Sequence, residues 1–240
     1  MSNIVRQNIE TKAREFRKKN GLGETIPVEF KSLLLNLNIL TIFRPLSDDF
    51  SGMCLKDTSF YGNKYMLINA NNPKGRQHFT IAHELYHLYY DDNFSPHKCD
   101  PGFSNNKTEK YADAFAAALL MPETGLSDFI YNTYNTGITL AKIIKIEQYY
   151  QVSRKALLVR LKELNFISKT IYDAFCELSP IKTAKEYGYD ISLYNNANEG
   201  LVIGNYGEMA KTLFDKEKIS EGHYLELLRT IYPETNNDLE

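Results

Sequence analysis

The sequence predicts an α+β fold, with a small, twisted, mainly antiparallel sheet packed on helices, and three observations lead to that prediction. Short apolar runs bounded by Ser, Asp, Gly and Asn occur at Ile39–Arg44, Gly52–Lys56 and Tyr65–Asn69, which is typical of short strands joined by turns. Helical periodicity precedes and follows these runs. The 240 residues, of which 43% are hydrophobic and 24% charged, suffice for one large core or two modest ones.

The composition also limits the class of protein. The chain has no run of 18 apolar residues and no charged-then-apolar leader, so we expect neither a membrane span nor secretion. Its three cysteines are far apart and form no C-x-x-C pair, which disfavours a disulfide framework and favours a cytoplasmic location. The formal net charge of -2 neither indicates nor excludes nucleic-acid binding.

Two helices are expected before the first strand. Asn3–Asn20 is amphipathic, with apolar residues on one stripe and most basic residues elsewhere, and Gly21 ends it. Val28–Asn36 follows Pro27 and directs several leucines inward. The basic residues of the first helix could bind nucleic acid, but a solvated helix face is the favoured interpretation.

The stretch His78–Tyr90 carries the clearest chemical motif, because His83, Glu84 and His87 spell H-E-x-x-H on an expected helix. Residues four apart on an α-helix lie one turn above each other, so both imidazoles can reach one metal ion. Glu84 flanks that position, where a carboxylate can act as general base toward a zinc-bound water. His78 lies off this face. The motif therefore indicates a zinc hydrolase with Glu84 as its catalytic residue.

The motif has only three fixed residues, and an ordinary half-buried histidine pair would match it equally well. Apolar residues flank the polar triplet on most sides of the expected helix: Phe79, Ile81, Ala82, Leu85, Tyr86, Leu88 and Tyr89. Polar groups buried in such a helix are costly unless they have a partner. These surroundings favour a bound metal.

A third protein ligand must come from elsewhere in the chain. A polar loop, Asp91–Asn106, leads to an expected helix, Lys107–Met121, that Pro122 ends. Glu109 and Asp113 lie one turn apart on this helix. With Glu109 as the third zinc ligand and Asp113 as hydrogen-bond acceptor for a ligand histidine, the site would be complete.

Other interpretations stay open for these residues. Asn106 with Glu109 three residues later also suits a capping box at the start of a helix. Asp113 could be an ordinary solvated residue of that helix. His97 and Cys99, in the preceding loop, form a weak alternative metal pair.

Two segments together resemble the ImmA/IrrE group of metallopeptidases: RQHFTIAHELYHLYY and, downstream, EKYADAFAAALLMP. The signature of that group pairs H-E-x-x-H with E-x-x-A-x-x-F-A-x-x-L-L-M-P. The second element is present without departure, at Glu109, Ala112, Phe115, Ala116, Leu119, Leu120, Met121 and Pro122. SGMCLKD and KYMLINANNPKGRQHF are similar to the sheet region before the motif in that group. The resemblance is strong over Ala13–Met121 and continues less strongly through Leu164.

The resemblance implies a minimal zincin fold, similar to the gluzincins. One zinc ion (Zn2+) is then expected to be held by His83, His87 and Glu109. Glu84 is expected to act as base and proton shuttle in the hydrolysis of a peptide bond.

The resemblance also implies how a substrate binds. In zincins the substrate commonly lies along the edge of the sheet as an added strand, and Gly52–Lys56 and Tyr65–Asn69 are the candidates for that edge. A tyrosine or histidine often stabilises the oxyanion. Seventeen tyrosines leave that choice open, and for His223 a surface position without such a role is favoured.

The region 128–170 contains two helical patterns, with Ser153 as a credible N-cap of the second. Residues 138–169 carry seven Lys or Arg against two Glu, a local charge of +5. A helix-turn-helix interpretation places Ser153, Arg154 and Lys155 at the start of a recognition helix that contacts DNA or a protein partner. The favoured alternative packs the leucines and isoleucines onto the preceding domain. VS-x-x-AL-x-x-RL segments are usual in the resembling family, which supports the shape more than DNA binding.

Three regions are therefore expected: a zincin-like domain at 1–127, a helix-turn-helix-like region at 128–170 and a C-terminal appendage at 171–240. The last region has thirteen Asp or Glu against six Lys or Arg, a local charge of -7. A solvated helical appendage is the default expectation, although it could shield the basic region or bind a partner. Some family members carry a GAF-like sensor here, but about 70 residues are few for one.

Two functions remain open. The first is a site-specific zinc metalloendopeptidase that inactivates a cytoplasmic regulator. Members of the resembling family cut helix-turn-helix repressors to release mobile-element, stress or toxin-antitoxin genes, so the substrate is expected to be such a repressor or an antitoxin. The second is a noncatalytic zinc-containing regulator that binds DNA or protein. A noncatalytic site would have no use for Glu84, so the sequence favours the enzyme.

Overall fold

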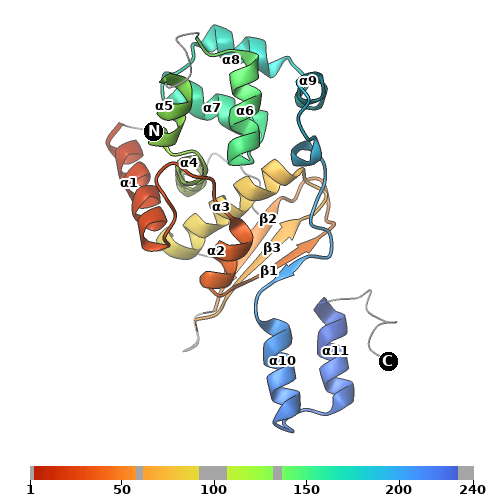
Figure 1. The fold of residues 1–240 in the computed structure, drawn as a ribbon. Coiled ribbons are helices and arrows are strands. Elements are labelled where there is room, and N and C mark those ends of the chain that lie inside the picture. Colours follow the sequence, from red (N-terminus) through yellow and green to blue (C-terminus); the bar gives the residue numbers. More distant parts are fainter. Residues whose placement is uncertain (1–2, 58–61, 92–106, 132–136, 232–240) are drawn as a thin grey trace.

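A computed structural model describes residues 3–57, 62–91, 107–131 and 137–231. Within these ranges the fold is α+β, as the sequence predicts, with a small sheet, a set of helices around the H-E-x-x-H segment and further helices at two opposite ends (Figure 1). None of the helices in the described ranges combines the length and the apolar composition that crossing a bilayer requires.

Among the described residues, the sheet has four strands in the order β2-β3-β1-β4. Their bounds are Ile39–Arg44 for β1, Gly52–Lys56 for β2, Lys64–Asn69 for β3 and Val202–Ile203 for β4. β2 pairs antiparallel with β3, and β1 pairs antiparallel with β4. β1 and β3, however, are parallel, with Ile39 opposite Lys64. The sheet is therefore mixed, because β2 lies at the edge and not between β1 and β3.

Alternating burial explains how the strands sit on the helices. Along β1 buried and half-buried residues alternate, and Ile39, Thr41 and Phe43 are the buried ones. Side chains two apart on a strand share a face, so one face of β1 is covered. Helix α2 (Phe30–Asn36) packs on β1, and helix α3 (Lys74–Tyr90) packs on the neighbouring strands β2 and β3 (Figure 1).

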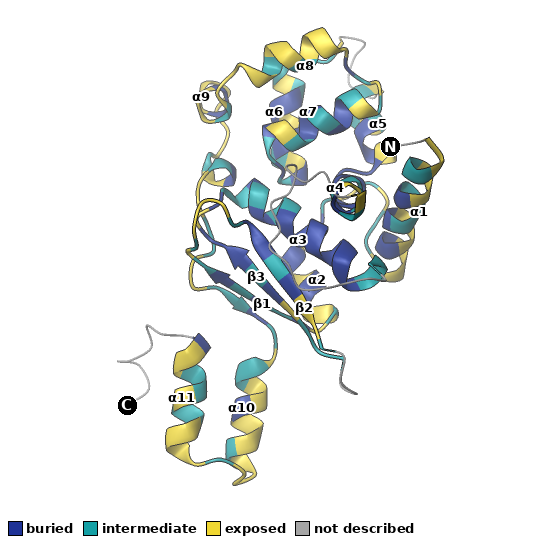
Figure 2. Cartoon of the chain, turned by 180° about the vertical axis from the view of Figure 1, so that it is seen from behind, coloured by how far each residue is buried: buried dark blue, intermediate teal, exposed yellow. Residues whose placement is uncertain are grey.

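Helix α3 is the central helix of the fold. It begins one turn before the expected start at His78, with Pro73 in the N-cap position. On one side it packs on β2 and β3, and on the other on α4 (Lys107–Leu120), which is covered in turn by α1 (Asn3–Lys19). Figure 2 shows α3 to be largely buried along its length. The alanine-rich composition of α4 permits its close approach to α3.

Five short helical elements follow α4: α5 (Glu123–Tyr131), α6 (Leu140–Tyr150), α7 (Arg154–Glu163), α8 (Lys169–Cys176) and α9 (Pro180–Glu186). Thr139, Ser153, Ser168 and Ser179 cap the last four with their side chains. Ser or Thr at this position accepts a hydrogen bond from a main-chain N–H that the helix leaves unpaired. The expected N-cap at Ser153 is thus present, and Gln151 adopts a left-handed conformation to turn the chain between α6 and α7.

The helix-turn-helix-like region is joined closely to the preceding residues. The Tyr150 hydroxyl donates to the carbonyl of Thr25 at 2.8 Å, and the Arg160 guanidinium donates to the carbonyl of Met121 at 3.2 Å. Leu157 and Leu161 belong to the same apolar core as Phe115 of α4. One continuous core therefore spans residues on both sides of the proposed boundary at 127.

Part of the region 171–240 returns to the sheet. The N–H of Lys74 donates to the carbonyl of Asn195 at 2.9 Å, and the buried Gln77 amide donates to the carbonyl of Ala197 at 2.7 Å. β4 then extends the sheet beside β1. The expectation of a wholly solvated appendage is wrong for this stretch, because its main chain supplies hydrogen bonds to β1 and α3.

The chain ends in a helical hairpin of α10 (Tyr206–Asp215) and α11 (Glu221–Ile231). The rings of Phe214 and Tyr224 stack between them, 5.1 Å apart and 14° from parallel. In both views the hairpin lies at the end of the molecule opposite α6, α7 and α8 (Figures 1 and 2). It therefore does not cover the basic helices, which was one of the roles considered for the acidic tail.

Candidate metal centre

Helix α3 places the Nε2 atoms of His83 and His87 close together. Both side chains are completely buried, and their Nε2 atoms lie 3.2 Å apart. The two residues are four positions apart in the helix, so their rings leave the same face one turn apart. Two nitrogens at about 2.0–2.1 Å from one tetrahedral ion would be separated by about 3.3 Å. The observed spacing suits two ligands of a single zinc ion.

Glu109, on α4, lies close to the same two nitrogen atoms. Its Oε2 lies 3.2 Å from Nε2 of His83, and its Oε1 lies 3.3 Å from Nε2 of His87. One ligand atom from each of the three buried residues lies within 4.8 Å of the other two. Imidazole nitrogen and carboxylate oxygen are donors that zinc accepts, and three protein ligands leave a position open. The residues present therefore fit a zinc ion.

Two aspartates contact the histidine rings at Nδ1, the ring nitrogen that faces away from the candidate metal position. Nδ1 of His83 lies 2.9 Å from Oδ1 of Asp113, and Nδ1 of His87 lies 3.0 Å from Oδ2 of Asp91. A carboxylate on Nδ1 keeps the proton there and leaves Nε2 free for a metal. Asp113 is the residue that the sequence suggests for this contact. Asp91 was missed, because its position one turn after His87 falls at the end of the helix, where we expected the loop.

The electrostatics of the site favour a positive charge. Burial opposes protonation of His83, but the hydrogen bonds to Asp113 and Glu109 and the charge of Glu84 outweigh it and raise its pKa to about 9. The same carboxylates would stabilise a metal cation in place of the proton. The candidate ligand atoms and the negative charge around them therefore both favour a bound cation.

Glu84 lies beside the three candidate ligands and is 1% exposed. Its Oε1 atom is buried and has no hydrogen-bond partner within the described residues. A buried carboxylate oxygen without a donor is costly, and such atoms are often found where a ligand or reacting group belongs. The charge of this carboxylate helps to raise the pKa of His83, so Glu84 lies within electrostatic reach of the candidate ligands.

The remaining histidines lie elsewhere. Nδ1 of His78 is 2.9 Å from the carbonyl of Gln151, so this residue links α3 to the turn between α6 and α7. His223 is exposed on α11. His97 and Cys99 fall outside the described residues.

The three residues considered for DNA contact have different surroundings. Ser153 caps α7, and its hydroxyl accepts from the N–H of Ala156 at 3.3 Å. Arg154 is 4% exposed and forms a buried ion pair with Glu147. Lys155 is exposed. The Arg154 side chain therefore faces the protein interior, and only the lysine presents its charge to solvent.

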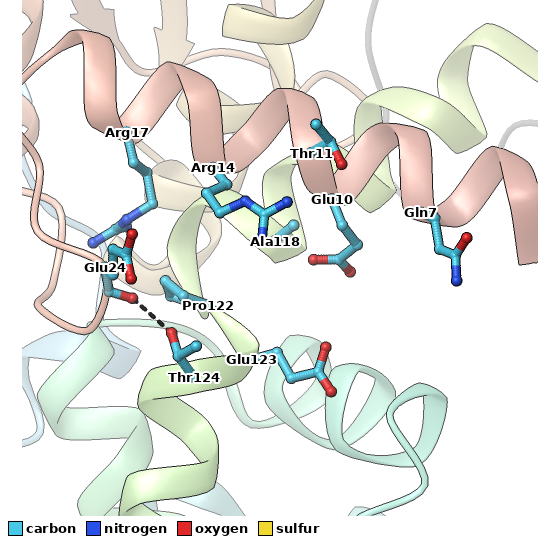
Figure 3. Close-up of a pocket in the computed structure, with 10 residues that line it drawn as sticks. All are labelled: Gln7, Glu10, Thr11, Arg14, Arg17, Glu24, Ala118, Pro122, Glu123 and Thr124. Carbon is cyan, nitrogen blue, oxygen red and sulfur yellow. Dashed lines mark hydrogen bonds between the residues drawn. The ribbon is translucent and has the colours of Figure 1, made fainter.

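A cavity of about 520 Å³ lies on the far side of α4 from the metal centre. Figure 3 shows Arg14 projecting into it from α1, with Glu24 and Thr124 opposite, joined by a hydrogen bond of 3.1 Å. Ala118 contributes from α4. It lies nine residues after Glu109, which places it about 180° around the helix. The cavity is therefore separate from the candidate metal site.

A mixed sheet, an H-E-x-x-H helix packed on it and a glutamate from the next helix define a zincin-like peptidase fold. A family model described as IrrE N-terminal-like domain (Peptidase_M78) matches residues 6–162, and the chain belongs to this peptidase family. The resemblance to the ImmA/IrrE group is thereby confirmed. The matched residues run from α1 into α7, so α8 to α11 and β4 lie beyond them. A comparison with curated proteins gave no match.

Proposed function

We propose that the protein is a zinc-dependent, site-specific endopeptidase whose substrate is a cytoplasmic regulator. The observation that carries this proposal is the convergence of His83, His87 and Glu109 next to Glu84, whose Oε1 has no hydrogen-bond partner within the described residues. Membership of a peptidase family supports the same reaction class.

The chemistry follows from these groups. A zinc ion bound by His83, His87 and Glu109 supplies Lewis-acid polarisation of a scissile carbonyl and lowers the pKa of water. Glu84 accepts the proton of the attacking water and returns it to the leaving nitrogen. Asp113 and Asp91 keep the two histidine rings oriented.

The strand order supports β2 as the strand along which the substrate binds. β3 lies between β2 and β1, so its main-chain groups are used on both sides, and β4 covers the other side of β1. β2 pairs with β3 alone among the described strands. Its outer edge can therefore accept the hydrogen bonds of an added substrate strand.

The expected substrate is a helix-turn-helix repressor or an antitoxin, as the resemblance to repressor-cleaving peptidases implies. An extended segment of such a protein could pair with β2 while its scissile bond reaches Glu84. A narrow substrate choice would come from the side-chain contacts on either side of that bond.

The alternative is a noncatalytic zinc-containing regulator that binds DNA or protein. The exposed Lys155 at the start of α7 is compatible with it. The inward orientation of Arg154 weakens the DNA version, because a buried, paired guanidinium cannot contact phosphate or bases. A purely structural site also gives no reason for a buried Glu84 whose Oε1 has no hydrogen-bond partner within the described residues.

The test is cleavage of a repressor or antitoxin encoded beside this protein. Wild type is expected to cut it at one bond, whereas Glu84→Gln, loaded with zinc to the same level, should be reduced by at least about 100-fold. Glu221→Gln, at an exposed position of α11, serves as the matched control. Equal cleavage by wild type and Glu84→Gln would remove the basis of the proposal. Binding without cleavage by both would favour the noncatalytic alternative.

A further inference from the structure

Strand β2 directs the main-chain groups of three of its residues away from β3. The N–H of Asp57 donates to the carbonyl of Asn63 at 2.8 Å, which fixes the hydrogen-bonded side of the strand. Main-chain groups alternate in direction along a strand, so Gly52, Cys54 and Lys56 turn theirs to the opposite side. In the strand order β2-β3-β1-β4 that side is the outer edge, where a substrate strand would pair.

The side chains of Cys54 and Lys56 lie on the face of β2 that is turned to α3. Sγ of Cys54 lies 3.7 Å from the main-chain carbonyl oxygen of Glu84. Lys56 comes two residues later and is exposed, so its side chain shares this face. A strand added beside β2 would place one of its own side chains next to Lys56 on the same face. Lys56 is therefore available to a substrate that lies close to the Glu84 segment.

Lys56 lies directly opposite Lys64 of β3. Because Asp57 and Asn63 are joined by a hydrogen bond, the lysines form the closer, non-hydrogen-bonded type of pair, with Cα atoms about 4.5 Å apart. Like charges directly opposite each other destabilise a sheet. The Lys64 ammonium lies 5.4 Å from the centre of the Tyr89 ring, a contact that leaves its charge in place. Neither lysine has a carboxylate partner within the described residues.

We propose that Lys56 binds an acidic side chain of the substrate, with Lys64 adding to the positive charge of the site. This inference rests on the proposed function and on β2 as the strand that binds the substrate. Repulsion from Lys64 directs the Lys56 ammonium outward, and a carboxylate there would offset the repulsion and accept a charge-assisted hydrogen bond. The acidic residue would lie two positions, or about 7 Å, along the substrate strand from the residue opposite Cys54. The expected substrate class is an extended peptide with Asp or Glu at one fixed position near the scissile bond.

Peptide selection tests the charge preference without cleavage. Decapeptides selected from a random library on zinc-loaded Glu84→Gln protein should share Asp or Glu at one fixed position. With Lys56→Glu added, the same selection should give Lys or Arg at that position. Lys145→Glu, at an exposed position of α6, is the matched control and should still give the acidic residue. Peptides without a charge preference, an unchanged preference in Lys56→Glu, or no selected peptides at all would each overturn the proposal.

The affinity of one selected peptide then shows whether Lys56 is the partner of its acidic residue. Exchange of that residue for the matching amide should weaken binding about tenfold, as expected for one hydrogen bond between charged groups. In Lys56→Ala the same exchange should have almost no effect, because the partner is already absent. Equal losses in both proteins would place the acidic residue elsewhere and would overturn the assignment.

Thermal unfolding separates loss of this contact from loss of the fold. Lys56→Glu places opposite charges across β2 and β3, so its unfolding midpoint should be no lower than that of wild type. A clearly lower midpoint would give Lys56 a structural role and would overturn the proposal. An acidic preference in a protein that cuts no repressor or antitoxin encoded beside it leaves the contact standing and removes only the proposed function. Cleavage without an acidic preference removes only the contact.

Discussion

Nδ1 of His87 lies 3.0 Å from a carboxylate oxygen of Asp91, one turn further along the chain. His83 has the equivalent contact with Asp113, which comes from a different helix. The two imidazoles are therefore held by separate elements, one by the end of α3 itself and one by α4. Both contacts leave the Nε2 atoms facing Glu109.

Asp91 is expected to support metal binding. Asp91→Ala removes the acceptor of the His87 ring, so zinc affinity should fall by about 10- to 100-fold. Competition with a chromophoric chelator measures this affinity directly. Asp173→Ala, at an exposed position of α8, should leave the affinity unchanged. An unaltered affinity in Asp91→Ala would mean that the ring is held by packing alone.

Glu109 is expected to be a ligand. Glu109→Ala leaves two protein donors, which is one fewer than zinc sites of the catalytic type use. The purified protein should then carry much less zinc than wild type by elemental analysis after dialysis. Glu123→Ala, an exposed carboxylate at the start of α5, is the control. Unchanged occupancy would exclude Glu109 from the site.

Arg154 is expected to contribute to stability and not to DNA binding. Arg154→Met leaves the buried Glu147 charge without its partner, which costs about 3–5 kcal/mol of unfolding free energy. Denaturant titration should show this loss, and the double variant Glu147→Met/Arg154→Met should recover part of it. Lys155→Ala should change stability by less than about 0.5 kcal/mol. A stable Arg154→Met with reduced DNA affinity would contradict this assignment.

His78 is expected to make the stability of the protein depend on pH. Burial lowers its pKa to about 4 in the folded protein, against 6.5 for the exposed side chain. The unfolded state therefore binds the proton more readily, so stability is full above about pH 6.5 and is lost as the pH falls toward 4. At pH 5 the loss amounts to about 2 kcal/mol. Denaturant titrations at pH 7.5 and pH 5 measure how much the free energy of unfolding falls between these pH values. The fall should be smaller for His78→Gln than for wild type, and His223→Gln serves as the control that should match wild type.

Gly52 is expected to be required for the contact between β2 and α3. Gly52→Ala brings a methyl group to 2.6 Å from Cγ2 of Thr80 and 3.0 Å from the carbonyl oxygen of Leu67. Overpacking of this kind costs about 1–3 kcal/mol. Gly222→Ala has open space around it and should cost nothing. The midpoint of thermal unfolding should be lower for Gly52→Ala than for Gly222→Ala. Equal midpoints would show that β2 can move away from α3 without loss of stability.

Much of the local structure was predicted from the sequence. The bounds of β1 and β2 agree with the prediction, and β3 is one residue longer. H-E-x-x-H lies on a helix because its apolar neighbours follow helical spacing. The parallel pairing of β1 with β3 was not predicted, and β4 was missed because two residues are too short to show an alternating pattern.

The sequence by itself indicated which apolar residues of each element are buried and which residue types could bind a metal, because periodicity and side-chain chemistry record both. Only the tertiary structure decided that Asp91 supports His87, that Arg154 faces Glu147, and that β2 is the outer strand beside α3. The reason is physical. Strand pairing uses main-chain groups that all residues share, and a long-range contact depends on how two elements pack, which no local pattern records.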